Sequence, residues 1–187
     1  MKKIGFIGAF EKTDLILYIS KLIVESGRSV LFIDLTRAQR ARYVVPTLVT
    51  GGPYVTQYEG IDVACTFSSF ESIAKYLKIP ELEYDFIMMD TDTREAFKLF
   101  NMQTNDINYF VTNFETYSLK RGLDVIGKIS DRIQIKKILF SKDLNQDLDE
   151  YLNFLSKDFA VEWDKEKIVF PYDMRRQYSN YGKSKTS

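Results

Sequence analysis

A short segment near the start of the chain, IGAFEKT at residues 7 to 13, combines groups that can hold an anion. It follows an apolar run and precedes a helix-like segment, so backbone N–H groups and the positive end of that helix would face one ligand. Gly8 and Ala9 are small enough for close backbone approach, Lys12 supplies a positive charge, and Thr13 offers a hydroxyl to a divalent cation. The candidate binding residues of this loop are Gly8, Ala9, Phe10, Glu11, Lys12 and Thr13.

Two aspartates stand at the carboxyl ends of predicted strands, where ligands bind in open α/β sheets. Asp34 closes the run RSVLFID, and Asp90 closes YDFIMMD. We expect both strands to lie next to the opening strand, so that Lys12, Asp34 and Asp90 meet at one crevice. No catalytic residue is identified. The plainer interpretation of each aspartate is a polar strand end that caps the next segment.

Alternating patterns of apolar residues predict a sheet with helices on both faces. The opening run leads into helical spacing in TDLILYISKLIVESG, and RSVLFIDLT follows as a continuous apolar strand of the kind found in parallel sheets. Repeated βα units of this kind predict an α/β fold, with a doubly wound, mostly parallel sheet flanked by helices. Later strands are predicted in YDFIMMD, INYFVTN, IQIKKILFS and KIVFPYD, and later helices in SFESIAKYL, TREAFKLF, SLKRGLDVIGKI and LNQDLDEYLNFLSK.

The segment from Thr36 to Phe67 is less regular, and YVTQYEGIDVACTF predicts a hairpin around Glu59 and Gly60. Cys65 has an apolar context and no activating histidine, which indicates an inert core residue. The paired methionines at 88 and 89 are likewise expected in the core. We expect one domain over residues 1–173 and a polar, basic tail over 174–187.

In order and spacing, these motifs resemble those of the MinD/ParA-type (SIMIBI class) P-loop ATPases over roughly residues 1 to 173. The family has a deviant Walker A motif, KGGxGK[ST], and later strands that read VLxIDxD, YDxIIIDT and VTNPE. Aligned with that motif, Ile7 takes the place of the signature lysine and Glu11 that of the last glycine. Lys12 and Thr13 match its GK[ST] end. The resemblance implies a P-loop NTPase-like fold, with Asp34 and Asp90 as the switch and Walker B carboxylates. It also implies that Thr13 and Asp90 are the candidate metal ligands.

The departures from the family pattern predict a degenerate nucleotide site. Glu11 adds a side chain and a negative charge beside the expected phosphates, which weakens binding. Ile7 removes a lysine that, in the family, reaches across a dimer interface, so hydrolysis should suffer most. Ser141 and Lys142 replace the asparagine-containing pair that reads the base, and Phe114 replaces the proline after Asn113. ATP and Mg²⁺ are therefore expected to bind weakly or not at all.

The resemblance leaves three functions open. The first is a degenerate homologue, not an efficient ATPase, that acts as a scaffold or regulatory partner in spatial positioning or in secretion or pilus assembly. The second is a working ATP- and Mg²⁺-dependent dimerisation switch. The third is a DNA partition protein, for which Arg37, Arg40 and Arg42 supply a local basic cluster. A protein partner is expected in the first case and a homodimer in the second.

A surface for a partner is predicted between Thr36 and Phe67 or in the basic tail. The apolar residues offered as that surface are Tyr43, Val44, Val45, Leu48 and Tyr54. The competing interpretation is that these residues pack a hairpin onto the sheet.

Composition excludes several other classes of function. Lys plus Arg and Asp plus Glu each number 26, which removes a whole-protein field favouring nucleic acid or anionic membrane. The absence of histidine excludes histidine-based triads and metal sites, and one cysteine cannot form an internal disulfide. No stretch approaches the length of a transmembrane segment. We expect a cytoplasmic protein that a partner can recruit to the inner face of the membrane.

Overall fold

The computed structural model describes residues 1–47, 51–112, 115–129, 137–141 and 167–170. Eight strands form one sheet in the order β3-β4-β2-β5-β1-β6-β7-β8. All neighbouring strands are parallel except the β3–β4 pair. The strands are β1 (Lys2–Ile7), β2 (Val30–Asp34), β3 (Tyr54–Tyr58), β4 (Ile61–Cys65), β5 (Phe86–Thr91), β6 (Ile107–Thr112), β7 (Lys137–Ser141) and β8 (Lys167–Phe170).

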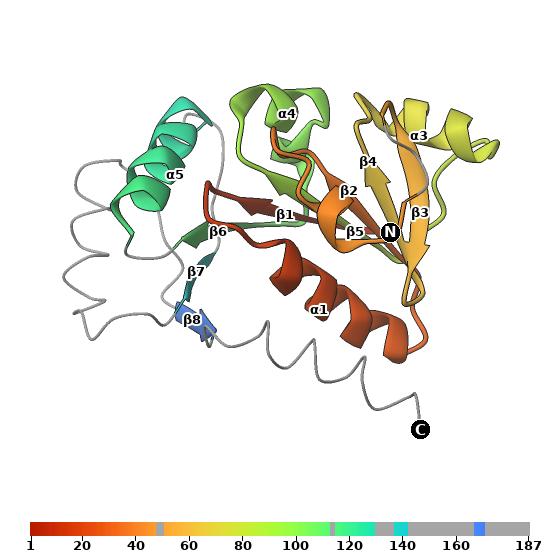
Figure 1. Cartoon of the computed structure of the whole chain (residues 1–187), viewed down its shortest axis with the longest axis horizontal. Coiled ribbons are helices and arrows are strands. Elements are labelled where there is room, and N and C mark those ends of the chain that lie inside the picture. Colours follow the sequence, from red (N-terminus) through yellow and green to blue (C-terminus); the bar gives the residue numbers. More distant parts are fainter. Residues whose placement is uncertain (48–50, 113–114, 130–136, 142–166, 171–187) are drawn as a thin grey trace.

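Helices cover both faces of this sheet, as the alternating pattern predicts (Figure 1). The longest is α1, which covers one face together with Ala41 of α2, while α3, α4 and α5 lie on the opposite face. The helices are α1 (Thr13–Glu25), α2 (Ala41–Val44), α3 (Phe70–Leu77), α4 (Arg94–Leu99) and α5 (Thr116–Ile129), with a 3-10 turn, η1, at Met102–Thr104.

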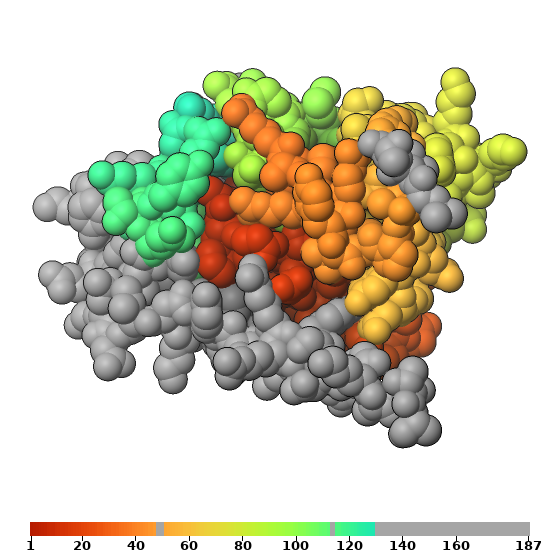
Figure 2. All heavy atoms as spheres, viewed as in Figure 1, coloured from red at the N-terminus to blue at the C-terminus, as the bar shows by residue number. Residues whose placement is uncertain are grey.

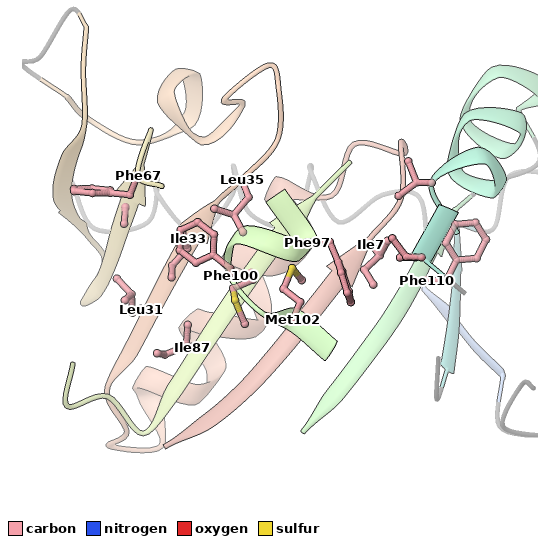
Figure 3. Packing of buried hydrophobic residues seen from close by; sticks show 14 of the residues in the cluster. Ile7, Leu31, Ile33, Leu35, Phe67, Ile87, Phe97, Phe100, Met102 and Phe110 are labelled. Atoms are coloured by element: carbon pink, nitrogen blue, oxygen red, sulfur yellow. The ribbon is translucent and has the colours of Figure 1, made fainter. Parts of the chain in front are cut away.

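The core consists of two apolar layers, one on each face of the sheet. Side chains alternate along β2, so Phe32 packs with α1 whereas Leu31 and Ile33 pack on the side of α3 and α4. Figure 3 shows the second layer, in which Ile7 lies on the same face as Phe97 and Phe110. Burial on both faces explains why the strands read as continuous apolar runs.

The strand order corrects one expectation about the site. β5 lies beside β1, with Phe6 opposite Asp90, as expected. β2 does not neighbour β1, because β5 lies between them and pairs Asp34 with Asp90. The two aspartates therefore sit side by side, with Asp34 one strand further from the loop.

The segment between β2 and β4 is more ordered than its sequence suggests. The predicted hairpin is present, with Glu59 and Gly60 at its turn, both at positive φ. Tyr54 lies in β3 opposite Cys65 and is buried, as is Val45, so their assignment to an exposed surface was wrong. Tyr43 and Val44 are exposed as predicted, and Leu48 lies outside the described residues.

The core assignments of three other residues are confirmed. Met88, Met89 and Cys65 are all fully buried. Burial raises the pKa of the Cys65 thiol to about 11, which keeps it protonated and unreactive near neutral pH. The predicted helix at 144–157 and the tail at 174–187 lie outside the described residues.

Candidate functional site

The loop between β1 and α1 begins at a position that only glycine can occupy. Gly8 has a φ of +141°, and a Cβ built there would lie 2.3 Å from the carbonyl oxygen of Val111. The Gly8 amide donates a hydrogen bond of 3.1 Å to the carbonyl of Thr91, at the end of β5. The start of the loop is thus fixed between the carboxyl ends of β5 and β6.

Lys12, the residue before α1, folds back over this loop. Its side chain is buried, and its Nζ lies 2.5 Å from Oδ1 of Asp90. The same ammonium donates a 2.7 Å hydrogen bond to the carbonyl of Gly8 and lies 3.4 Å from that of Phe10. The structure therefore brings together Gly8, Lys12 and Asp90, three of the residues that the sequence placed at one site.

The two predicted metal ligands carry oxygen atoms that the described part of the chain does not satisfy. Burial raises the pKa of Asp90 to about 7, against the opposing effect of Lys12. Apart from that ion pair, the Asp90 carboxylate accepts no hydrogen bond from a described residue. The hydroxyl of Thr13, at the first position of α1, is also buried and has no hydrogen-bond partner among these residues.

Glu11 occupies the amino end of α1. The backbone N–H of Thr13 donates a 2.8 Å hydrogen bond to Oε1 of Glu11. In loops that bind phosphate, this first helical amide faces the anion. Here a carboxylate of the same chain takes that position.

The carboxylate of Asp34 accepts hydrogen bonds from the segment that follows its strand. Its Oδ1 accepts hydrogen bonds from the amide and hydroxyl of Thr36, at 2.9 and 2.6 Å, and its Oδ2 accepts one of 2.8 Å from the Ala41 amide. Burial raises the Asp34 pKa, and these hydrogen bonds oppose the rise. The contacts match the plainer interpretation of Asp34 as a cap for the next segment.

These contacts test whether the loop fits ATP and Mg²⁺. The metal side fits, because Thr13 and Asp90 present buried oxygens of the kind that Mg²⁺ prefers. The phosphate side does not fit as it stands, because the Thr13 amide and the Lys12 ammonium both face carboxylates of this chain. Within the described ranges, no group of three or more acidic or cysteine side chains is arranged so that it could hold a metal ion.

Ile7, which stands where the resembling family has its signature lysine, is a core residue. It ends β1, is 0% exposed, and packs in the layer that contains Phe97 and Phe110 (Figure 3). Ala9 and Phe10 follow at intermediate burial, and Phe10 packs partly against the layer beneath α1. No positive side chain stands at position 7 to face a ligand or a second protomer.

Several other predicted features lie at or beyond the edge of the described chain. β7 ends at Ser141, and Lys142, Asn113 and Phe114 lie outside the described residues. The predicted base-reading side of the site therefore remains a prediction.

Asp92 lies beside the candidate site, two residues after Asp90, and the sequence did not single it out. It accepts a 3.0 Å hydrogen bond from the Arg37 amide and so joins the segment after β2 to the end of β5. The signal was the acidic spacing in DTDT at residues 90 to 93, where two carboxylates stand two positions apart.

Two arginines of the basic cluster at residues 37 to 42 contact other residues of the same chain. The Arg37 guanidinium lies 3.9 Å from Glu95, and Arg42 donates to the Thr66 hydroxyl at 3.1 Å and lies over the Tyr54 ring. Two of the three arginines thus contact their own chain, which weakens the interpretation of this cluster as a nucleic-acid surface.

Comparison with known proteins gives structural relatives only. No family model matches the chain, and no curated protein matches it. MinD in the MinC:MinD complex of Aquifex aeolicus aligns with 97% of this chain and 86% of its own, at 16% identity and a TM-score of 0.59. A ParA family ATPase from Chlorobium tepidum covers 96% and 89%, at 13% identity and a TM-score of 0.62. Apo McdA from Cyanthece covers 98% and 94%, at 13% identity and a TM-score of 0.60.

These likenesses extend over nearly the whole chain, at identities that support shared architecture alone. They agree with the mostly parallel sheet flanked by helices. Among the helices that the structure describes, none is long and apolar enough to cross a membrane. The chain has the MinD/ParA-like P-loop NTPase fold.

Proposed function

We propose that this chain is a degenerate MinD/ParA-like protein that works through interaction, as a scaffold or regulatory partner, with weak or no ATP hydrolysis. The systems in view are spatial positioning and secretion or pilus assembly, in the cytoplasm or at a membrane to which a partner recruits the chain. The observation that carries the proposal is Ile7. A fully buried isoleucine replaces the lysine that the family resemblance assigns to charge stabilisation across a dimer.

The segment after β2 supplies the surface for a protein partner. In Figure 2 this segment, coloured orange, forms a broad part of the visible face beside the red amino-terminal region. Tyr43 is 83% exposed and Val44 is also exposed, so an aromatic and an aliphatic group stand together on α2. Tyrosine is enriched among the residues that dominate binding energy at protein interfaces.

The alternative function is an ATP- and Mg²⁺-dependent dimerisation switch. Two observations favour it. Among the described residues the buried Thr13 hydroxyl has no hydrogen-bond partner and the Asp90 carboxylate has only its ion pair with Lys12, so both could coordinate a metal ion. The buried Ile7 opposes it. So do the Thr13 amide and the Lys12 ammonium, which would bind phosphate but already contact carboxylates of the chain.

Two measurements on the full chain separate these functions. The first is phosphate release from ATP with Mg²⁺, for the unmodified chain and for Thr13→Val, which removes only the unpaired hydroxyl. We expect the same negligible rate for both proteins. A Mg²⁺-dependent rate that Thr13→Val abolishes would establish the switch instead.

The second measurement is sedimentation with and without ATP and Mg²⁺. We expect an oligomeric state that ATP leaves unchanged and that Tyr43→Ala alters. Ser68→Ala, an exposed change outside α2, serves as the control. Dimerisation that appears only with ATP would overturn the scaffold function.

A further inference from the structure

The two groups in this loop that would hold a phosphate both face carboxylates of the chain itself. Glu11 accepts the first helical amide, from Thr13, at 2.8 Å. Asp90 lies 2.5 Å from the Lys12 ammonium. Each carboxylate thus stands where a negatively charged ligand would make the same contact. The groups that would bind a phosphate are therefore already in contact with side chains of the same chain.

The two carboxylates differ in how easily a ligand could displace them. Lys12 and Asp90 are each about 1% exposed, and Asp90 belongs to a central strand, so their pair can separate only if the loop moves. Glu11 is only partly buried and belongs to the loop itself. Its side chain can leave the Thr13 amide by rotating, without a change in the sheet. Glu11 is therefore the displaceable group.

The surroundings indicate a built site rather than a helix end with an ordinary cap. α1 has 13 residues, so its amino end carries a substantial positive partial charge. The hydroxyl of Thr13, in the same first turn, is fully buried and has no partner among the described residues. A cap explains the Glu11 contact, but it leaves this buried hydroxyl unexplained.

We propose that Glu11 is an internal ligand of the anion site, and that a phosphate-bearing molecule binds only by displacing its carboxylate from the Thr13 amide. The inference rests on the proposed function, because it takes the loop from Gly8 to Lys12 as the phosphate loop. It adds a regulatory element to that loop. Glu11 weakens binding by occupying the amide, and its charge alone is not the cause.

Two substitutions at Glu11 distinguish two causes of weak ligand binding. One cause is occupation of the Thr13 amide by the Glu11 carboxylate, and the other is charge repulsion between that carboxylate and the ligand. Glu11→Gln removes the charge but keeps an oxygen that can accept from the Thr13 amide. Glu11→Ala removes both the charge and the acceptor. If occupation dominates, Glu11→Ala binds phosphate-bearing ligands more tightly and Glu11→Gln recovers only a small part of that gain. Glu25→Gln, an exposed change at the far end of α1, removes one charge from the same helix and is the matched control.

The experiment is titration calorimetry of the full-length variants with Mg²⁺ and pyrophosphate, and separately with Mg²⁺ and ATP. We expect Glu11→Ala to bind about tenfold more tightly than the unmodified chain, the gain from about one recovered charge-assisted hydrogen bond. Glu25→Gln should leave the affinity unchanged. Equal gains for Glu11→Gln and Glu11→Ala would overturn occupation in favour of charge repulsion. No gain for a folded Glu11→Ala variant would overturn the proposal altogether.

The Thr13 amide gives a second, direct measurement. In a ¹H–¹⁵N spectrum we expect its resonance to move upfield in Glu11→Ala and to return downfield when pyrophosphate is added. A Thr13 resonance that neither change affects would contradict the proposal. The proposed function fails separately, through rapid ATP turnover, because turnover and ligand affinity are measured independently.

Discussion

Lys12 and Asp90 form a buried ion pair that joins the loop after β1 to the carboxyl end of β5. Their Nζ and Oδ1 atoms are 2.5 Å apart, and neither side chain is more than 1% exposed. The pair spans 78 residues of sequence and holds the loop against the sheet. Removing one partner leaves the other charge buried without compensation.

We therefore expect Lys12→Met to destabilise the chain by about 3 kcal/mol, within the range for breaking one side of a buried ion pair. Lys12→Met combined with Asp90→Asn should cost less than the sum of the two single changes, because the two partners interact. Urea denaturation followed by circular dichroism gives these free energies.

The matched control for this pair is Lys128→Met. Lys128 contacts Asp124 at 2.7 Å, but both side chains are exposed, so the loss should stay within about 0.5 kcal/mol. Equal losses for Lys12→Met and Lys128→Met would show that the buried pair contributes no more than a surface pair.

Ile7→Lys is expected to destabilise the chain severely. The side chain of Ile7 is fully buried in an apolar layer, and a buried ammonium without a partner costs several kcal/mol. Ile7→Val should cost only about 1 kcal/mol. Thermal unfolding of both variants checks this. A stable Ile7→Lys protein would show that position 7 can face solvent, and it would remove the main support for the proposed function.

Gly8→Ala should destabilise the chain by about 2 kcal/mol or more, because the new Cβ would meet the Val111 carbonyl and the backbone has positive φ. Gly127→Ala in α5 is the opposite case, since a Cβ there meets nothing within 4 Å. It should stabilise the chain by about 0.5 to 1 kcal/mol through helix propensity. A urea midpoint of Gly8→Ala that rises or stays unchanged would contradict the strained loop.

Thr13→Val is expected to stabilise the ligand-free chain by about 1 kcal/mol, because it removes a buried hydroxyl that lacks a hydrogen bond among the described residues. Ser20→Ala, in the same helix, removes a second such hydroxyl and should act similarly. Thermal unfolding with added Mg²⁺ and ATP distinguishes the two. If the alternative switch function holds, only Thr13→Val loses the stabilisation by ligand. A destabilised Thr13→Val protein would show that the hydroxyl has a partner in the folded chain.

Cys65 is expected to react with a thiol reagent at pH 8 at least about 100-fold more slowly in the native chain than in urea. Burial raises its pKa from 9.0 to about 11, so the thiolate is about 100-fold scarcer, and the side chain is also inaccessible. Because this pKa is raised by folding, its contribution to stability is complete below pH 9.0 and is lost as the pH rises toward about 11. Rapid native labelling at pH 8 would contradict the buried position.

Local sequence patterns predicted much of the fold. The hairpin turn at Glu59 and Gly60 and the helix after the loop both follow from residue types within a few positions. The short helix α4, predicted in TREAFKLF, begins after Thr93, whose hydroxyl accepts a hydrogen bond from the Ala96 amide. Such features depend on neighbours in sequence, and a single sequence contains that information.

The placement of β2 and the exposure of Tyr54 depend on distant parts of the chain. β2 pairs with β4 and β5, and no local signal distinguishes that order from one in which it lies beside β1. Tyr54 is 1% exposed because the predicted hairpin of β3 and β4 packs onto the sheet, and no local signal indicated which hairpin residues that packing would bury.

The candidate site was likewise predicted in part. The order of motifs identified Gly8, Lys12 and Asp90 as neighbours, and the structure brings them together. The contact of Glu11 with the Thr13 amide depends on a side-chain conformation, so the sequence indicated its charge but not its position. Asp34 could equally serve a ligand or a cap, and its contacts with Thr36 and Ala41 favour the cap.

The strand order has a consequence for synthesis of the chain on the ribosome. β1 is made before both of its neighbours, β5 and β6, which begin at Phe86 and Ile107. At roughly 5 to 20 residues per second, several seconds pass before either neighbour is made. During that time the central strand of the sheet has no partner, and its apolar side chains are open to chaperones and to other nascent chains.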